Sequence, residues 1–121
     1  MNINKLIILE GGYNEEHYVS LKTSLEIQKI FNELGIKYKI IRVKPKNFSK
    51  VISKYKKYLC FNALHGPFGE DGQIQNILKK NNINFTHSGV KSSTICFDKA
   101  ATKKIISKNN ILTPKFSIIN T

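Results

Sequence analysis

A histidine, three glycines and two carboxylates follow one apolar segment of the chain. Residues 58–64 are typical of a buried strand, and they run into His65-Gly66-Pro67-Phe68-Gly69-Glu70-Asp71-Gly72. The apolar spacing of residues 74–80 then predicts a helix. Glycines let the backbone turn tightly and approach a ligand closely, and open α/β sheets bind ligands where their strands end. The pattern predicts a ligand site on this turn without naming the ligand.

Within this turn, His65 is open to three interpretations, because a histidine here can be a satisfied buried residue, a proton carrier or a substrate contact. The nearby carboxylates of Glu70 and Asp71 could orient its ring and favour its charged form. Glu70 is expected to shape the loop, and Asp71 is most simply the N-cap of the helix that follows.

A second carboxylate, Glu16, lies in the loop after the first apolar segment, residues 5–9, and after Gly11-Gly12. A carboxylate in such a loop can receive an ammonium group through charge-assisted hydrogen bonds. Taken alone, it is also compatible with an ordinary solvent-exposed loop residue.

Strands and helices alternate along the rest of the chain, with Ser20 as the predicted N-cap of the first helix and Gly35 as its left-handed end. This order predicts a three-layer α/β domain with a mostly parallel sheet of about four strands. The expected strands cover residues 5–9, 36–43, 58–64, 84–86 and 115–119, and the expected helices cover residues 21–34, 48–57, 74–80, 90–97 and 99–108.

The length and composition fit one soluble globular domain, with 121 residues and 40% hydrophobic residues. No apolar run approaches the roughly 20 residues of a membrane span, and the N-terminus lacks a signal-peptide cleavage site. We therefore expect a cytoplasmic protein with no membrane partner. Cys60 and Cys96 both lie among apolar residues, and both are predicted to be buried structural thiols.

The net charge of +12 comes from nineteen lysines and a single arginine, Arg42, against eight acidic residues. Base-edge readout of nucleic acids relies heavily on arginine, so the composition favours a solvated lysine surface with no nucleic-acid partner. A non-enzymatic basic α/β binding module remains the alternative. Lysines gather most densely at Lys44, Lys46, Lys50, Lys54, Lys56 and Lys57.

Five segments, in order, resemble motifs of the N-terminal domain of the D-alanine–D-alanine ligase family, a group of ATP-grasp enzymes. The segments are Gly11-Gly12-Tyr13-Asn14-Glu15-Glu16-His17-Tyr18-Val19-Ser20-Leu21, residues 65–72, Phe85-Thr86-His87-Ser88-Gly89-Val90, Phe97-Asp98-Lys99-Ala100-Ala101-Thr102-Lys103 and Ile111-Leu112-Thr113-Pro114. The resemblance implies a Rossmann-like pre-ATP-grasp domain over residues 1–97. It also implies that residues 98–121 begin an incomplete ATP-grasp domain.

The resemblance implies ATP-dependent synthesis of D-alanyl-D-alanine through an acyl phosphate, for peptidoglycan. D-alanine would be the substrate, with ATP and Mg²⁺ held mostly outside this chain. The missing central and C-terminal domains would complete the enzyme, and a homodimer is implied. We expect the 121-residue chain alone to be inactive. Another ATP-grasp ligase, one that makes D-alanyl-D-lactate, shares this architecture and remains an alternative.

The resemblance also assigns roles to residues. Glu16 would hold the ammonium group of the first D-alanine, with His65 beside it, and these two are the predicted catalytic residues. Further substrate contacts would come from Val19, Ser20 and Gly66. Lys99 would lie near the nucleotide phosphates, and no metal ligand is predicted in the chain. The sequence departs from the family pattern at His17, Tyr18, Thr23, Ser24 and His87, of which His87 replaces a glycine and would restrict its turn.

Overall fold

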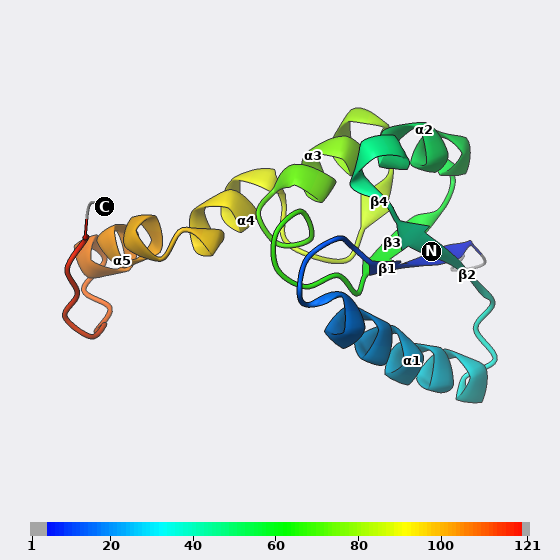
Figure 1. The fold of residues 1–121 in the computed structure, drawn as a ribbon, viewed down its shortest axis with the longest axis horizontal. Helices are drawn as coiled ribbons and strands as arrows, with labels where there is room; N and C mark the ends of the chain where they lie inside the picture. The colour runs from blue at the N-terminus through cyan, green and yellow to red at the C-terminus, as the bar shows by residue number, and fades with distance from the viewer. Residues whose placement is uncertain (1–4, 120–121) are drawn as a thin grey trace.

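A computed structural model describes residues 5–119. The ends of the predicted domain ranges, residues 1–4 and 120–121, lie outside the described residues. Four parallel strands form one sheet in the order β2-β1-β3-β4 (Figure 1). Their bounds are Leu6–Gly11 for β1, Tyr38–Val43 for β2, Leu59–Asn62 for β3 and Asn84–Phe85 for β4. The predicted four-stranded parallel sheet is confirmed.

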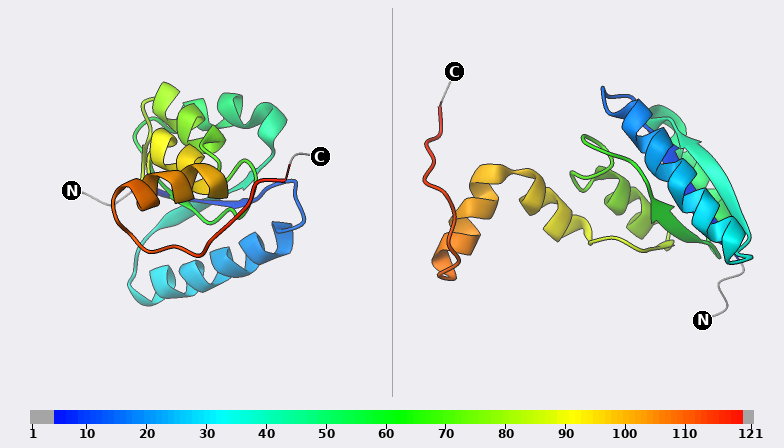
Figure 2. Two further views of the ribbon diagram at one scale, coloured as in Figure 1. Left: turned by 90° about the vertical axis from the view of Figure 1, so that its left-hand side faces the viewer. Right: turned by 90° about the horizontal axis from the view of Figure 1, so that it is seen from below.

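Helices cover both faces of this sheet. The long helix α1, His17–Glu33, lies along one face, and α2, Phe48–Ile52, and α3, Gln73–Lys80, lie on the other (Figure 1). These three layers are the predicted ones. Two further helices, α4, Val90–Phe97, and α5, Lys99–Lys108, lead away from the sheet (Figure 2).

The single helix predicted over residues 48–57 is wrong in length, because the α-helical part ends at Ile52. A short 3₁₀ turn, Pro45–Asn47, precedes α2, and a second one, Ser53–Tyr55, follows it. The hydroxyl of Ser53 donates to the carbonyl oxygen of Lys50 at 2.9 Å. Such a local bond competes with the helical pattern, and the chain tightens here into the second turn.

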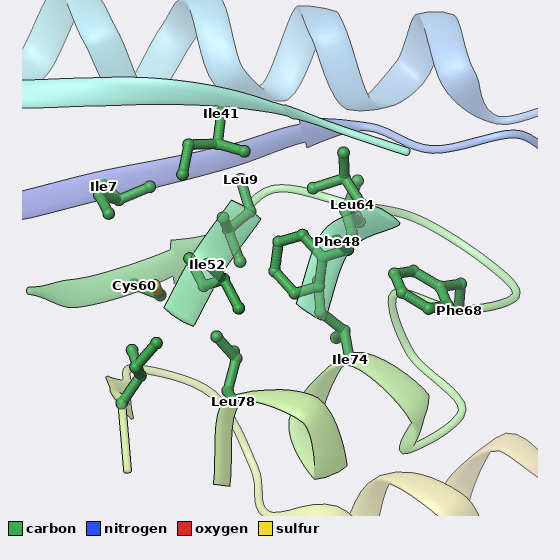
Figure 3. Close-up of a cluster of buried hydrophobic side chains, with 12 residues drawn as sticks. Ile7, Leu9, Ile41, Phe48, Ile52, Cys60, Leu64, Phe68, Ile74 and Leu78 are labelled. Carbon is green, nitrogen blue, oxygen red and sulfur yellow. The ribbon is translucent and has the colours of Figure 1, made fainter. Parts of the chain in front are cut away.

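The central strand β1 is buried at all six positions, because it has a strand on each side and a helical layer on each face. Ile7 and Leu9 belong to the core between the sheet and the α2–α3 layer (Figure 3). Leu6 and Ile8 alternate to the opposite face, where α1 lies. A continuous apolar run is typical of such a parallel strand.

The core continues underneath residues 65–72, here called the glycine turn, which pack against it through Phe68. This side chain is only 4% exposed, and its ring meets that of Phe48 edge to face, with 6.1 Å between the centroids (Figure 3). Phe68 has a positive φ of 72°. A bulky residue keeps this conformation only where its surroundings enforce it, so packing of this ring holds the turn in place.

Ser20 does not cap α1, and this prediction is wrong. The helix begins earlier, at His17, with Glu16 at the N-cap position. Ser20 is fully buried against the sheet, where its Oγ accepts a hydrogen bond from the amide of Gly11 at 2.9 Å. A buried backbone amide needs an acceptor, and a small hydroxyl supplies it while letting α1 lie close to β1.

The C-terminal segment also differs from the sequence prediction. Residues 115–119 form no strand, since no neighbouring strand lies beside them among the described residues. The segment instead runs along α5 (Figure 2), where Lys103 Nζ donates to Thr113 Oγ1 at 2.8 Å and to the carbonyl of Pro114 at 2.9 Å. Gly35, by contrast, has the predicted left-handed conformation after α1, with φ of +66°.

Lysines and tyrosines pack together at the amino end of the sheet. Lys5 Nζ lies 5.9 Å from the ring centroid of Tyr58, and Lys39 Nζ lies 5.8 Å from that of Tyr55. The two tyrosine rings meet edge to face at 5.3 Å. These cation–π contacts use two of the many lysines for local packing.

Replacing Ser20 with alanine should lower the free energy of unfolding by about 1–2 kcal/mol, because the buried amide of Gly11 then lacks its acceptor. Urea unfolding of the wild type and the variant measures the difference. Ser49→Ala, at an exposed position of α2, is the matched control and should change the free energy by less than about 0.5 kcal/mol. Equal effects of the two substitutions would contradict the assignment.

The two cysteines should react at very different rates with a thiol reagent. The expectation of two buried thiols is wrong for Cys96, which is exposed near the end of α4, whereas Cys60 in β3 is fully buried. Burial also raises the pKa of the Cys60 thiol to about 12, so its reactive thiolate is scarce. Ellman's reagent should label one thiol in the folded protein and two in urea. Labelling of both in the folded protein would refute this.

Candidate functional site

Two loops meet at the carboxyl end of the sheet. Residues 12–16 follow β1 and residues 63–72 follow β3, and these two strands are direct neighbours. Asn14, in the first loop, donates through Nδ2 to the carbonyl oxygens of His65 at 2.9 Å and Pro67 at 3.1 Å in the second. The strand end at which a site was predicted is therefore formed by two loops that are distant in sequence.

The carboxylate of Glu16 lies against the backbone of Gly66. A Cβ atom placed on Gly66 would be 2.8 Å from Glu16 Oε1, and the residue has a φ of +67°. The positive φ favours glycine at this position, and the end of the Glu16 side chain occupies the space that a Cβ atom would take. The structure thus brings Glu16, which is exposed, next to the peptide that follows His65.

The imidazole ring of His65 is held from two sides. Its Nε2 lies 2.8 Å from the hydroxyl Oγ1 of Thr23 in α1, and its Nδ1 lies 3.8 Å from Oε1 of Glu70. A hydroxyl can donate or accept, so Thr23 fits either protonation state of the ring. The half-buried ring can therefore contact a ligand in a defined orientation.

A cavity of about 490 Å³ opens beside His65, between the glycine turn and α4. Its walls include the side chains of Thr23, Gln75 and His87. Among the residues that the structure describes, three buried side-chain atoms have no hydrogen-bond partner, namely Oε1 of Gln75 and both ring nitrogens of His87. Burial lowers the pKa of His87 to about 4, so its ring is neutral at pH 7.

The other predicted substrate residues lie on α1 and differ in accessibility. Val19 is 46% exposed, whereas the hydroxyl of Ser20 is occupied by the amide of Gly11 in the interior. Their contact with a substrate stays a prediction. Lys99 is exposed in the first turn of α5, away from the two loops (Figure 1), so the structure does not bring it together with Glu16 and His65.

Asp71 acts inside the glycine turn as well as at the helix start. The N-cap position of α3 is Gly72, so the predicted cap is displaced by one residue. The carboxylate accepts from the amide of Gln73 at 3.0 Å and from that of Phe68 at 2.9 Å. Burial acts to raise the pKa of Asp71, but these hydrogen bonds outweigh it and lower the pKa below its usual value. The ionised carboxylate therefore stabilises the turn.

Asn14 and Gln75 are the residues that the sequence reasoning missed. Asn14 sits in a glycine-rich loop, where asparagine side chains commonly bond to nearby backbone, and this was the available signal. The sequence held no signal for Gln75, because a glutamine in a helix is normally exposed.

Within residues 5–119, no group of three or more His, Cys, Asp or Glu side chains could hold a metal ion. The same residues include no helix with the length and apolar character needed to cross a membrane.

Stability should fall at mildly acidic pH because of His87. Its pKa of about 4 in the folded protein lies below the unfolded value of about 6.5, so the unfolded chain takes up the proton first. The stabilisation from the neutral ring is present above pH 6.5 and is lost as the pH falls towards 4. We expect a loss of about 1–2 kcal/mol, since the ring is only partly buried.

Urea unfolding at pH 7 and pH 4.5 tests this for the wild type and His87→Phe, which keeps the ring contact with Phe85 but cannot titrate. The difference between the two proteins should grow at the lower pH in favour of the variant. A difference that does not depend on pH would show that His87 is not the group involved.

Known proteins resemble this chain in both sequence and structure. A scan of protein-family models finds no match. D-alanine–D-alanine ligase of Pelagibacter ubique is 48% identical over 117 residues, covering 96% of this chain and 38% of the relative. D-alanine–D-alanine ligase B of Brucella suis is 35% identical, covering 93% of this chain and 36% of the relative. The chain thus spans a little over a third of the length of these relatives.

Solved structures agree with these sequence matches. The D-alanine–D-alanine ligase of Bacillus anthracis in complex with ATP superposes with a TM-score of 0.79 at 28% identity, covering 92% of this chain and 38% of that one. The enzyme of Aeromonas hydrophila, at 20% identity and a TM-score of 0.78, shares the fold. Across nearly its whole length, the chain is homologous to the N-terminal part of the D-alanine–D-alanine ligases.

Proposed function

We propose that this chain is the N-terminal, substrate-binding part of an ATP-dependent D-alanine–D-alanine ligase, which forms a carbon–nitrogen bond between two D-alanine molecules. The observation that carries this proposal is the position of the Glu16 carboxylate against Gly66, next to His65. Both residues lie in motifs that resemble the family pattern, and the matching relatives have this name.

In this proposal, Glu16 receives the ammonium group of the first D-alanine. The carboxylate is exposed and can accept charge-assisted hydrogen bonds from a small cation. His65 directly precedes Gly66 in the facing loop, and its ring lies against Thr23 and Glu70. Val19 and Gly66 would add contacts around the substrate, and the buried Ser20 would act from beneath by fixing the amide of Gly11. The role of all these residues is orientation, which lowers the entropic barrier to a reaction between two bound molecules.

ATP would supply the phosphoryl group that converts one D-alanine carboxylate into an acyl phosphate, open to attack by the amine of the second D-alanine. Support for ATP comes from the Bacillus anthracis relative, which was solved in complex with it. Lys99 is exposed, and its ammonium is suited to a phosphate. Mg²⁺ and most of the nucleotide contacts are proposed to lie in parts of the enzyme other than residues 5–119.

We further propose a cytoplasmic role in peptidoglycan precursor synthesis and a homodimeric enzyme. The outer face of α1 supports a self-associating surface, because three large apolar side chains are more than half exposed there, namely Tyr18, Leu25 and Ile30. Isolated exposed apolar residues are common on protein surfaces, but several on one helix are suited to an interface.

Glu16→Gln in the full-length gene product should lower kcat/KM for D-alanine by about 10- to 100-fold, because a charge-assisted hydrogen bond to the substrate is weakened. Phosphate release with ATP and D-alanine measures this. Glu15→Gln, at the neighbouring exposed carboxylate, is the control and should change the rate by less than about twofold. Unchanged turnover in Glu16→Gln would refute the assignment, and a preference for D-lactate as second substrate would indicate the depsipeptide-forming type.

A further inference from the structure

We propose that Asn14 is a positioning residue, which fixes Glu16 relative to His65 and so sets the geometry of the ammonium pocket. This inference rests on the proposed function for its effect on D-alanine. The tie between the two loops stands on the contacts of the side chain itself.

The amide group of Asn14 forms three hydrogen bonds, which use both of its ends. Its Oδ1 accepts from the backbone amide of Glu16 at 2.8 Å. Its Nδ2 donates to the carbonyl oxygens of His65 at 2.9 Å and Pro67 at 3.1 Å. A reversed amide group would set its NH₂ against the Glu16 amide and its oxygen against two carbonyls, so only one orientation satisfies all three partner groups.

These bonds join parts of the chain that are 51 and 53 residues apart. Among the described residues, Asn14 supplies every side-chain hydrogen bond between residues 12–16 and residues 65–72. The other polar contacts of the first loop are local, such as that of His17 Nδ1 with the carbonyl of Gly12 at 3.0 Å. Glu16 is exposed, and its position relative to the second loop is fixed largely by Asn14.

The side chains of Asn14 and Glu16 both lie against Gly66. A Cβ atom at this position would be 3.1 Å from Asn14 Nδ2 and 2.8 Å from Glu16 Oε1. The amide and the carboxylate therefore approach the same stretch of backbone. A displacement of the Asn14 side chain would free both the Glu16 backbone amide and the carbonyl of His65, and it would change how the carboxylate lies over the turn.

Kinetics of the full-length gene product test the effect on the substrate. In Asn14→Ala, the KM for D-alanine should rise about tenfold, while the KM for ATP should change by less than about twofold, since two modest hydrogen bonds between the loops are lost. Asn76→Ala, at an exposed position of α3, is the control and should change neither. Equal increases in both KM values would indicate a general structural defect and overturn the proposal.

A double-mutant cycle separates positioning from a merely structural role. If Asn14 acts through Glu16, then Asn14→Ala should add less than about twofold to the loss already caused by Glu16→Gln. Independent, multiplying effects would contradict the proposal. Asn14→Asp provides a second test, because it keeps the acceptor for Glu16 but replaces the NH₂ donor by an oxygen, and it should raise the KM for D-alanine as Asn14→Ala does.

Amide hydrogen exchange tests the tie between the loops without reference to activity. Exchange in residues 12–17 and in residues 65–70 should accelerate together, by about tenfold, in Asn14→Ala and not in Asn76→Ala. Acceleration confined to residues 12–17 would overturn the proposal. If the wild-type protein shows no D-alanine-dependent phosphate release, the proposed function fails, and the exchange result still decides whether Asn14 joins the loops.

Discussion

The complete burial of β1 is the constraint on which the other elements depend. This strand has neighbours on both edges and helices over both faces, so even Glu10 within it is only 5% exposed. A buried carboxylate requires a partner, and Arg42 on β2 provides one, with Nη2 and Nε at 2.7 and 3.2 Å from Oε1. This ion pair helps to fix the register of β1 against β2, and Gly11 therefore has a defined position at the carboxyl edge of the sheet.

Beyond that edge, contacts of single side chains hold the backbone of the loops in place. The ring of Phe68 fills the core beneath the glycine turn, Ser20 satisfies the last amide of β1, and Asn14 joins the two loops. Each of these residues has a different task, yet all of them restrict backbone that would otherwise be exposed and mobile. An exposed carboxylate such as Glu16 can hold a small substrate in one orientation only if the backbone beneath it is held in this way.

The apolar periodicity was enough to predict the four parallel strands and the helices that cover them, because burial on one or both faces leaves a direct mark on the sequence. Contacts between distant segments leave no such mark. Ser20 looked like a helix cap, but the partner of its hydroxyl is an amide nine residues earlier, and Cys96 looked buried, although its apolar neighbours lie on an exposed helix. Glu16, His65 and Gly66 came from motif resemblance, whereas the bridging side chain of Asn14 required coordinates.

The lysine–tyrosine packing at the amino end of the sheet lies at the opposite end from the loops that carry the site. The two ends of the strands thus differ, since one packs lysines against tyrosines and the other carries the loops of the proposed site. Surface engineering can exploit this separation. Fluorescent labels or immobilisation chemistry placed at the amino end of the sheet, beside these lysines, would lie far from the two loops and would leave the proposed pocket open to solvent.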